Sequence, residues 1–248
     1  MISTDGGDGA AAISLTKVLE KAPDLVSLYK TAGASVRRHG LEDVRAAVYL
    51  VLDRSGSMRP YYRNGTMQYL AERVLSLSAH LDDDGTVPVV FFSTDVDGST
   101  DLTLGRHRRR IDKLHQNLGH MGRTNYHWAM DAVIDHYMES GCRCPALVVF
   151  QTDGGPTSKA AAERYLCKAA RLPLFWQFIG FGDPDDNEFA FLRKLDTLAV
   201  PSHRAVDNAG FFHAGRNPRA IPDHRLYDQL LGEFPDWLAA ARSAGILS

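Results

Sequence analysis

Three oxygen-bearing side chains stand at alternate positions, Asp53, Ser55 and Ser57, directly after the apolar run 48–52. The run predicts a buried strand, and the polar side chains are delivered into the turn beyond its end. Carboxylate and hydroxyl oxygens are hard ligands, suited to a small divalent cation such as Mg²⁺ rather than to zinc. Gly56 keeps the turn tight and lets the backbone approach closely. These residue types indicate a site for a divalent cation.

The stretch resembles the start of the metal-ion-dependent adhesion site (MIDAS) of the von Willebrand factor A (vWA) family, which reads Asp-x-Ser-x-Ser. That family completes its site with a Thr from a second loop and an Asp from a third. Thr124 stands before a helical pattern, and Asp153 follows the apolar run 146–150, so both are present in the family's order. The metal ligands that the resemblance implies are Asp53, Ser55, Ser57, Thr124 and Asp153.

The resemblance also implies a function. In the family the hydroxyls bind the metal directly, and the Asp residues often bind it through water. An ion held mainly by neutral oxygens keeps much of its electrophilicity and takes an anionic ligand. We therefore expect Mg²⁺, or Mn²⁺ or Ca²⁺ in its place, to bridge to an Asp or Glu carboxylate of a partner protein. No catalytic base is needed, so we expect no enzymatic activity.

Further segments resemble the vWA proteins of bacterial tellurite-resistance and stress operons, which are TerF-like. They are 152–157, 178–182, 191–196 (Phe-Leu-Arg-Lys-Leu-Asp) and 206–212 (Val-Asp-Asn-Ala-Gly-Phe-Phe), and the last two indicate this subgroup. The similarity extends over about residues 13–245 and implies partners among other proteins of such an operon. One departure is Arg54 with Arg59 beside the metal loop, where two cations either reinforce attraction for an anion or reject the metal.

Two other interpretations of Asp53 remain open at this stage. Asp is a good helix N-cap, which is a purely structural role. Alternatively, Asp53 is the nucleophile of a magnesium-dependent, haloacid-dehalogenase-like phosphotransferase, with the acidic run 183–186 as its late metal motif. That mechanism needs a second carboxylate two residues after the nucleophile, where this chain has Ser55. No nucleotide-binding Gly-x-x-x-x-Gly-Lys-Ser/Thr motif occurs either.

Composition narrows the class of protein. The chain has 248 residues, 44% of them hydrophobic, which suffices for one sizeable α/β domain. A net charge of −2 favours neither nucleic acid nor a membrane surface as partner. The N-terminus has no signal-peptide pattern, and no run reaches the roughly 18 to 20 apolar residues of a membrane span. Cys142 and Cys144 are interpreted as plain thiols, which favours a reducing compartment and a cytoplasmic location.

The order of patterns predicts the fold. Residues 1–12 are expected to be a disordered tail, 13–45 an N-terminal helical strap with two short helices, and 46–248 the vWA domain. Strands are predicted at 47–52, 87–92, 98–104, 146–151, 174–181 and 203–206, separated by helical patterns. We expect a Rossmann-like α/β fold: a central, mostly parallel sheet with one antiparallel edge strand and helices on both faces. Ligands gather at the carboxyl ends of such strands, where Asp53 and Asp153 stand.

Other conspicuous residues have simpler structural explanations. The basic run 106–110 is predicted to be an exposed helix face rather than a nucleic-acid site. Trp128, Trp176 and Trp237 fall on apolar faces and are predicted to be core residues.

Overall fold

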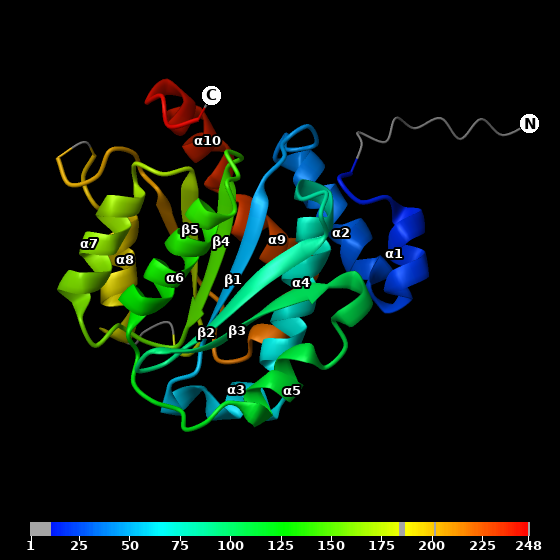
Figure 1. Cartoon of the computed structure of the whole chain (residues 1–248), viewed down its shortest axis with the longest axis horizontal. Helices are drawn as coiled ribbons and strands as arrows, with labels where there is room; N and C mark the ends of the chain where they lie inside the picture. Colours follow the sequence, from blue (N-terminus) through cyan, green and yellow to red (C-terminus); the bar gives the residue numbers. More distant parts are fainter. Residues whose placement is uncertain (1–10, 184–186, 201, 248) are drawn as a thin grey trace, which may run out of the picture.

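A computed structural model describes residues 11–183, 187–200 and 202–247 and shows one six-stranded sheet (Figure 1). The strand order is β3-β2-β1-β4-β5-β6. All neighbouring pairs are parallel except β2 and β3, so the edge strand β3 is antiparallel. The strands are β1 (Ala47–Asp53), β2 (Thr86–Phe92), β3 (Val96–Thr103), β4 (Ala146–Thr152), β5 (Leu174–Gly180) and β6 (Ala209–His213). The predicted fold class is confirmed.

The central strands are apolar on both faces because each face is covered by helices (Figure 1). In β1, Val48, Leu50 and Leu52 belong to one core, and Tyr49 and Val51 belong to the other. This alternation is the two-residue period of a strand. The first core is closed by α1, α2, α4, α9 and α10, and the second by α6, α7 and α8.

The helices follow the predicted patterns closely. Apolar residues recur on α4 at spacings of three and four, beginning with Met67, Leu70 and Val74. This helix is buried along nearly its whole length. Pro235 stands in the first turn of α10, so it restarts the C-terminal helical segment rather than kinking it. The α-helices are α1 (Leu15–Lys21), α2 (Val26–Arg38), α3 (Arg59–Arg63), α4 (Thr66–Leu81), α5 (Arg110–Asn117), α6 (Tyr126–Glu139), α7 (Lys159–Ala169), α8 (Ala190–Asp196), α9 (Asp223–Leu231) and α10 (Phe234–Ser243). Single 3₁₀ turns are η1 (Pro23–Leu25), η2 (Gly56–Met58), η3 (Leu104–Arg106), η4 (Asn187–Phe189) and η5 (Pro218–Ala220).

The segment 13–45 holds two α-helices joined by a 3₁₀ turn at Pro23. Helix α2 packs closely on α4, since a Cβ on Gly33 would lie 2.6 Å from the His80 ring. The His80 ring also stacks on Tyr29, and its Nε2 lies 2.8 Å from the Tyr29 carbonyl oxygen. The segment therefore shares the core of the main sheet. Of the predicted tail 1–12, only residues 11 and 12 lie within the described residues.

The last strand differs in position from its prediction. It is Ala209–His213, and not 203–206. The earlier segment is a turn in which buried Arg204 donates hydrogen bonds to the carbonyl oxygens of Asp196 and Leu198 at the end of α8. The short run that contains Phe211 and Phe212 forms the strand instead.

The basic run and one tryptophan also differ from their predictions. Arg106 ends η3 and Arg110 begins α5, and His107 is buried in the turn between them, with Nε2 3.1 Å from Asp24 Oδ2. Trp176 and Trp237 are core residues, as predicted, but Trp128 is 43% exposed on the first turn of α6. The 3.6-residue period of α6 places Trp128 on the side opposite its buried residues Met130, Val133 and Tyr137.

The cysteine interpretation is also wrong. Cys142 and Cys144 form a disulfide in the loop between α6 and β4, where the turn brings their Cα atoms to 5.5 Å. The step from plain thiols to a reducing compartment therefore loses its basis. Among the described residues, no helix is both long and apolar enough to cross a membrane.

Candidate metal site

The candidate site lies at the carboxyl ends of β1 and β4, which are adjacent parallel strands at the centre of the sheet. Asp53 is the last residue of β1, and Asp153 follows the last residue of β4. The register pairs Leu52 with Gln151, so the two loops leave the same edge side by side. In Figure 1 this is the lower edge, where the chain turns into α3. The strand ends thus bring together side chains that are distant in the sequence.

Hydroxyl and carboxylate oxygens form a connected cluster there. The Ser57 hydroxyl donates to Asp153 Oδ1 at 2.9 Å, and the Ser55 hydroxyl lies 3.4 Å from the same oxygen. The two serine hydroxyls are 3.2 Å apart. These three side chains therefore converge, as the resemblance implied.

Asp53 lies beneath this cluster and is fully buried. Its Oδ1 accepts a hydrogen bond from the Ser55 amide, and its Oδ2 accepts one from the Thr152 hydroxyl, each at 2.6 Å. Tyr62 donates to the Asp53 carbonyl oxygen at 3.0 Å, which ties α3 to the end of β1. Thr152 therefore fixes the orientation of the carboxylate, a supporting role of the kind that shapes metal sites.

Thr124 lies on a neighbouring loop that is joined to the other two by backbone hydrogen bonds. The Gly56 amide donates to the Gly122 carbonyl oxygen at 3.1 Å, and the Thr157 amide donates to the Thr124 carbonyl oxygen at 2.7 Å. The Thr124 hydroxyl itself makes no hydrogen bond to the other four candidate ligands, all of which are described residues. All three loops are thus in contact, while the convergence of side chains is shown for Ser55, Ser57 and Asp153.

Side-chain helix caps do not account for the polar residues of these loops. Asn125 is the N-cap residue of α6, but its side-chain amide donates to the Thr94 carbonyl oxygen at 2.7 Å. Asp53 Oδ1 accepts a hydrogen bond from the Ser55 amide within the turn. A role like that of a helix N-cap therefore accounts for only one of the two Asp53 carboxylate oxygens.

Arg54 does not enter the site, although it stands between two candidate ligands. Its side chain is 1% exposed, and its Nη1 lies 2.6 Å from Asp97 Oδ2 on β3. It also donates to His115 Nδ1 at 3.1 Å and to the carbonyl oxygen of Gly119 at 2.8 Å. Sequence patterns missed this role, because an Arg in a polar loop is usually solvated. Arg54 holds the site loop against β3 and α5.

The electrostatics of the cluster favour a cation. Burial and the negative charge of Asp153 raise the pKa of the Asp53 carboxyl to about 7, although hydrogen bonds from Thr152 and Ser55 oppose the shift. A dication beside the two carboxylates would offset both effects. In the described part of the chain, the candidate site included, no three His, Cys, Asp or Glu side chains are grouped so as to hold a metal. A site here depends on hydroxyl oxygens, which suit Mg²⁺.

We expect the stabilising effect of Mg²⁺ to grow with pH. The pKa of Asp53 is about 7 in the folded chain against 3.8 for a free side chain, so the folded state binds the proton more tightly. Without metal, this group's contribution to stability is fully present below about pH 4 and is lost as the pH rises to about 7. A Mg²⁺ ion bound by Asp53 would compete with that proton, so its stabilisation would be larger at about pH 8 than at about pH 5.5. Thermal unfolding in Mg²⁺ and in EDTA at both pH values measures it, and an equal metal-dependent shift would contradict it.

The acidic run of the phosphotransferase alternative is only partly visible. Asp183 forms an ion pair with Arg216, and residues 184–186 lie outside the described residues. At the position of the required second carboxylate, the Ser55 hydroxyl lies within the oxygen cluster.

A Rossmann-like sheet with an oxygen cluster at the ends of β1 and β4 is the architecture that the vWA resemblance implied. The family model for the vWA domain found in the TerF C terminus matches residues 45–247. The chain is also 35% identical over 226 residues to the uncharacterized protein YcbR of Bacillus subtilis (strain 168), covering 88% of each chain. The chain belongs to the vWA family, in the group named for the C terminus of TerF. The family prediction is confirmed.

Solved structures resemble the chain at the level of the fold. Proximal thread matrix protein 1 from the mussel byssus gives a TM-score of 0.51 at 16% identity, covering 76% of this chain and 47% of that chain. Manganese-loaded TRAP protein of Plasmodium vivax gives a TM-score of 0.46 at 19% identity, covering 71% and 70%.

Proposed function

We propose that the chain is a metal-ion-dependent protein-binding module. The observation that carries this proposal is the oxygen cluster in which Asp153 accepts from Ser57 and lies near Ser55. Asp53, Ser55, Ser57, Thr124 and Asp153 would hold the cation, with Mg²⁺ as the first choice and Mn²⁺ or Ca²⁺ as substitutes. A bound dication would supply a positive centre that takes an Asp or Glu carboxylate of a partner protein.

The chain's own residues would prepare the site for this task. Asp53 is fixed from two sides by the Ser55 amide and the Thr152 hydroxyl, so it needs no rearrangement to orient its charge. Ser57 is exposed and Ser55 is buried, so the cluster extends from the interior to the surface, where a partner has access. The Arg54 guanidinium is fully engaged in the interior, so it does not compete with a cation for the site.

We assign the module no catalytic activity. The phosphotransferase alternative would need a general acid where Ser55 stands, and a hydroxyl with an ordinary pKa is a poor acid for a leaving group. Purified protein should therefore not turn over phosphomonoesters. Turnover that is lost in Asp53→Asn would favour the enzyme instead.

We place the module in a bacterial tellurite-resistance or stress-response assembly. This assignment is supported by the family model, which describes the vWA domain of TerF. Tagged protein should retain proteins of the same operon in Mg²⁺ and release them in EDTA. Retention that is identical in EDTA would contradict the metal-dependent part of the proposal.

Replacing Thr124 tests the contribution of the second loop. We expect Thr124→Ala to lower the affinity for Mg²⁺ by about tenfold or more, because one hard oxygen ligand is lost. Calorimetric titration with Mg²⁺ measures this affinity. Thr157→Ala is the matched control, since Thr157 is exposed on the adjacent loop and is tied to it through its backbone amide. Equal affinities in the two variants would remove Thr124 from the site.

A further inference from the structure

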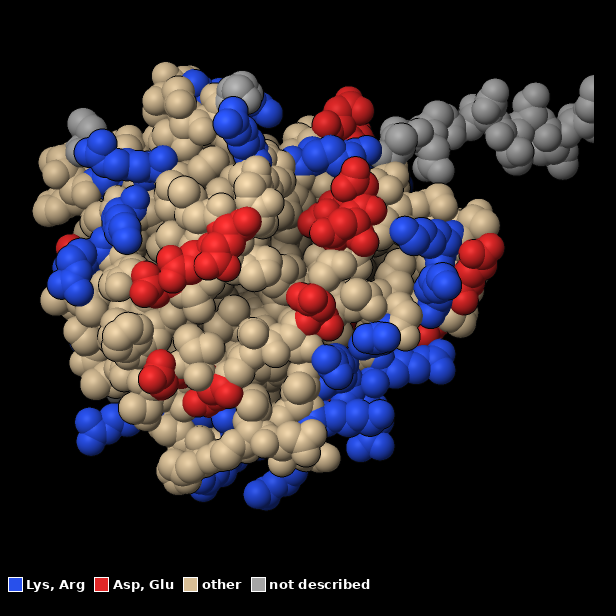
Figure 2. Space-filling model, in the orientation of Figure 1, with Lys and Arg blue, Asp and Glu red and all other residues tan. Residues whose placement is uncertain are grey.

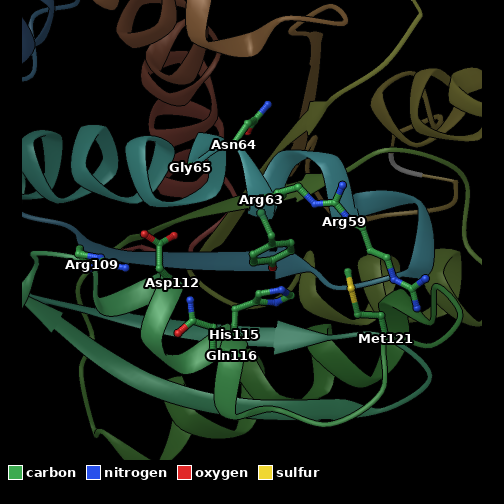
Figure 3. A pocket seen from close by; sticks show the side chains of 10 residues that line it. Arg59, Arg63, Asn64, Gly65, Arg109, Asp112, His115, Gln116 and Met121 are labelled. Carbon is green, nitrogen blue, oxygen red and sulfur yellow. The ribbon is translucent and has the colours of Figure 1, made fainter.

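A pocket of about 670 Å³ lies between α3 and α5. Figure 3 shows Arg59 and Arg63 on the α3 side of the pocket and Asp112 and His115 on the α5 side, with Arg109 at the end of the pocket away from Arg59. A volume of this size takes several side chains of a bound peptide.

The pocket is strongly basic. Arg59, Arg63 and Arg109 all line it, and Asp112 is the single acidic residue among the lining residues. The three arginines are exposed, and none forms an ion pair or hydrogen bond from its side chain to any described residue. In Figure 2, several blue Lys and Arg side chains stand among tan residues along the lower edge of the molecule, which is the edge with α3 and α5 in Figure 1. The pocket therefore carries positive charge that the described part of the chain does not neutralise.

The inner wall of the pocket is ordered by packing. The His115 ring stacks on Tyr62 with centroids 4.0 Å apart and an interplanar angle of 11°. Its Nδ1 accepts from Arg54 Nε at 3.1 Å, and burial together with Arg54 lowers the pKa of the His115 ring. The ring is therefore neutral and carries its proton on Nε2, so that it can act as a donor. A donor on a fixed wall suits an acceptor-only ligand such as a carboxylate.

Arg109 reaches the pocket at the cost of an uncommon backbone conformation. Its φ is 53°, and among the described residues it is the one non-glycine with positive φ. Such a conformation is unfavourable for a long side chain and tends to be retained where it serves a function. Here it places Arg109 at the start of α5, among the residues that line the pocket and at its other end from Arg59.

The pocket and the metal site share their loops. Arg59 stands two residues after the candidate ligand Ser57, and Met121 lines the pocket one residue before Gly122, whose carbonyl accepts from Gly56. We propose that this pocket binds a second acidic side chain of the same partner segment whose first carboxylate occupies the metal. The proposal rests on the proposed function and specifies the partner: a protein segment with several Asp or Glu residues rather than a lone carboxylate. Guanidinium groups bind carboxylates in charge-assisted, often bidentate pairs, so the pocket selects for clustered acidic residues.

Two synthetic peptides in a Gly/Ser background test the proposal. One has a single Glu, and the other has the same Glu followed after one residue by three Asp. Titration followed by NMR in Mg²⁺ should show that the wild type binds the clustered peptide about tenfold or more tightly than the single-Glu peptide. We expect Arg59→Ala/Arg63→Ala to abolish this preference while calorimetric Mg²⁺ affinity stays unchanged. The control is Arg225→Ala/Arg242→Ala, which removes the same charge from two exposed arginines of α9 and α10 and should keep the preference.

The outcomes separate the two proposals. A preference that survives in Arg59→Ala/Arg63→Ala, or that is lost equally in the control, overturns the role of the pocket. Failure of both peptides to bind the wild type also overturns it. Single-Glu binding that persists in EDTA contradicts the metal bridge, whatever the arginines do. A phosphoserine peptide that binds in EDTA through Arg59 and Arg63, while the clustered carboxylates do not, would make the pocket a phosphate site instead.

Discussion

Asp53→Asn should abolish Mg²⁺ binding and, in the absence of metal, make the protein more stable at about pH 8. The Asn oxygen can still accept from the Ser55 amide, and the Asn amide can donate to Thr152, whose hydroxyl already lies 3.1 Å from the Gly154 carbonyl oxygen. The buried charge and its repulsion with Asp153 disappear. We expect a gain in the free energy of unfolding on the order of 1 kcal/mol or more. Chemical unfolding in EDTA measures the gain, and calorimetry measures the loss of Mg²⁺ binding.

Asp82→Asn provides a matched control for that result. Asp82 directly follows α4 and is not one of the candidate metal ligands. Burial and the charge of Asp84 raise the pKa of the Asp82 carboxyl to about 6. Its replacement should also stabilise the protein slightly at the same pH, but it should leave Mg²⁺ binding intact. An Asp53→Asn protein that is less stable than the wild type in EDTA would show that the carboxylate is not repelled by its neighbours in the folded chain. Retained Mg²⁺ affinity in that variant would remove Asp53 from the site.

Asp53 is expected to favour Mg²⁺ binding and to lower the stability of the metal-free protein. The local sequence predicts only part of this. Periodicity predicted β1 and α4, because a long apolar run and a long stripe each have one favourable solution. The turn after β1 could then be assigned its chemistry, since Asp53, Ser55 and Ser57 are close in sequence. The family resemblance placed Asp53 beside Asp153, but the raised pKa of Asp53 was not predictable, because its largest cause is the full burial of the carboxyl.

Two predictions from the sequence, the last strand and the position of Trp128, differ from the structure. The last strand was predicted at 203–206 but is β6, Ala209–His213. The buried Arg204 donates hydrogen bonds to carbonyl oxygens at the end of α8, and the residues near it therefore form a turn. Trp128 was assigned to the core, although its helix has its apolar side elsewhere. A strand of five residues offers too few positions for periodicity to locate it, whereas the exposure of Trp128 agrees with the 3.6-residue period of the whole of α6.

Arg54 illustrates the same limit at the site. From the sequence, an arginine between two ligands either attracts an anion or rejects the metal, and only the fold decides between these outcomes. Because β3 lies antiparallel at the edge of the sheet, Asp97 reaches Arg54 and draws its guanidinium away from Asp153. The conformation of the site loop therefore depends on an ion pair that no local motif reveals.

Asp97→Ala should destabilise the protein far more than the loss of an exposed ion pair would. It would leave the Arg54 guanidinium, which is 1% exposed, without its carboxylate in the interior. Removing one partner of a buried ion pair costs about 3–5 kcal/mol. Asp97 also accepts from the Ser93 hydroxyl at 2.7 Å, so a second hydrogen bond is lost. Urea unfolding followed by circular dichroism measures the change, and the site loop should bind Mg²⁺ more weakly as Arg54 seeks another partner.

Two comparisons decide whether the ion pair is the cause. Arg54→Met/Asp97→Ala removes both charges and should recover part of the lost stability, because no unpaired charge remains in the interior. Glu163→Ala breaks the exposed pair with Lys194 and should cost about 1 kcal/mol or less. If Asp97→Ala were as mild as Glu163→Ala, Arg54 would be free to find solvent or another partner. The position of the site loop would then not depend on its ion pair with β3.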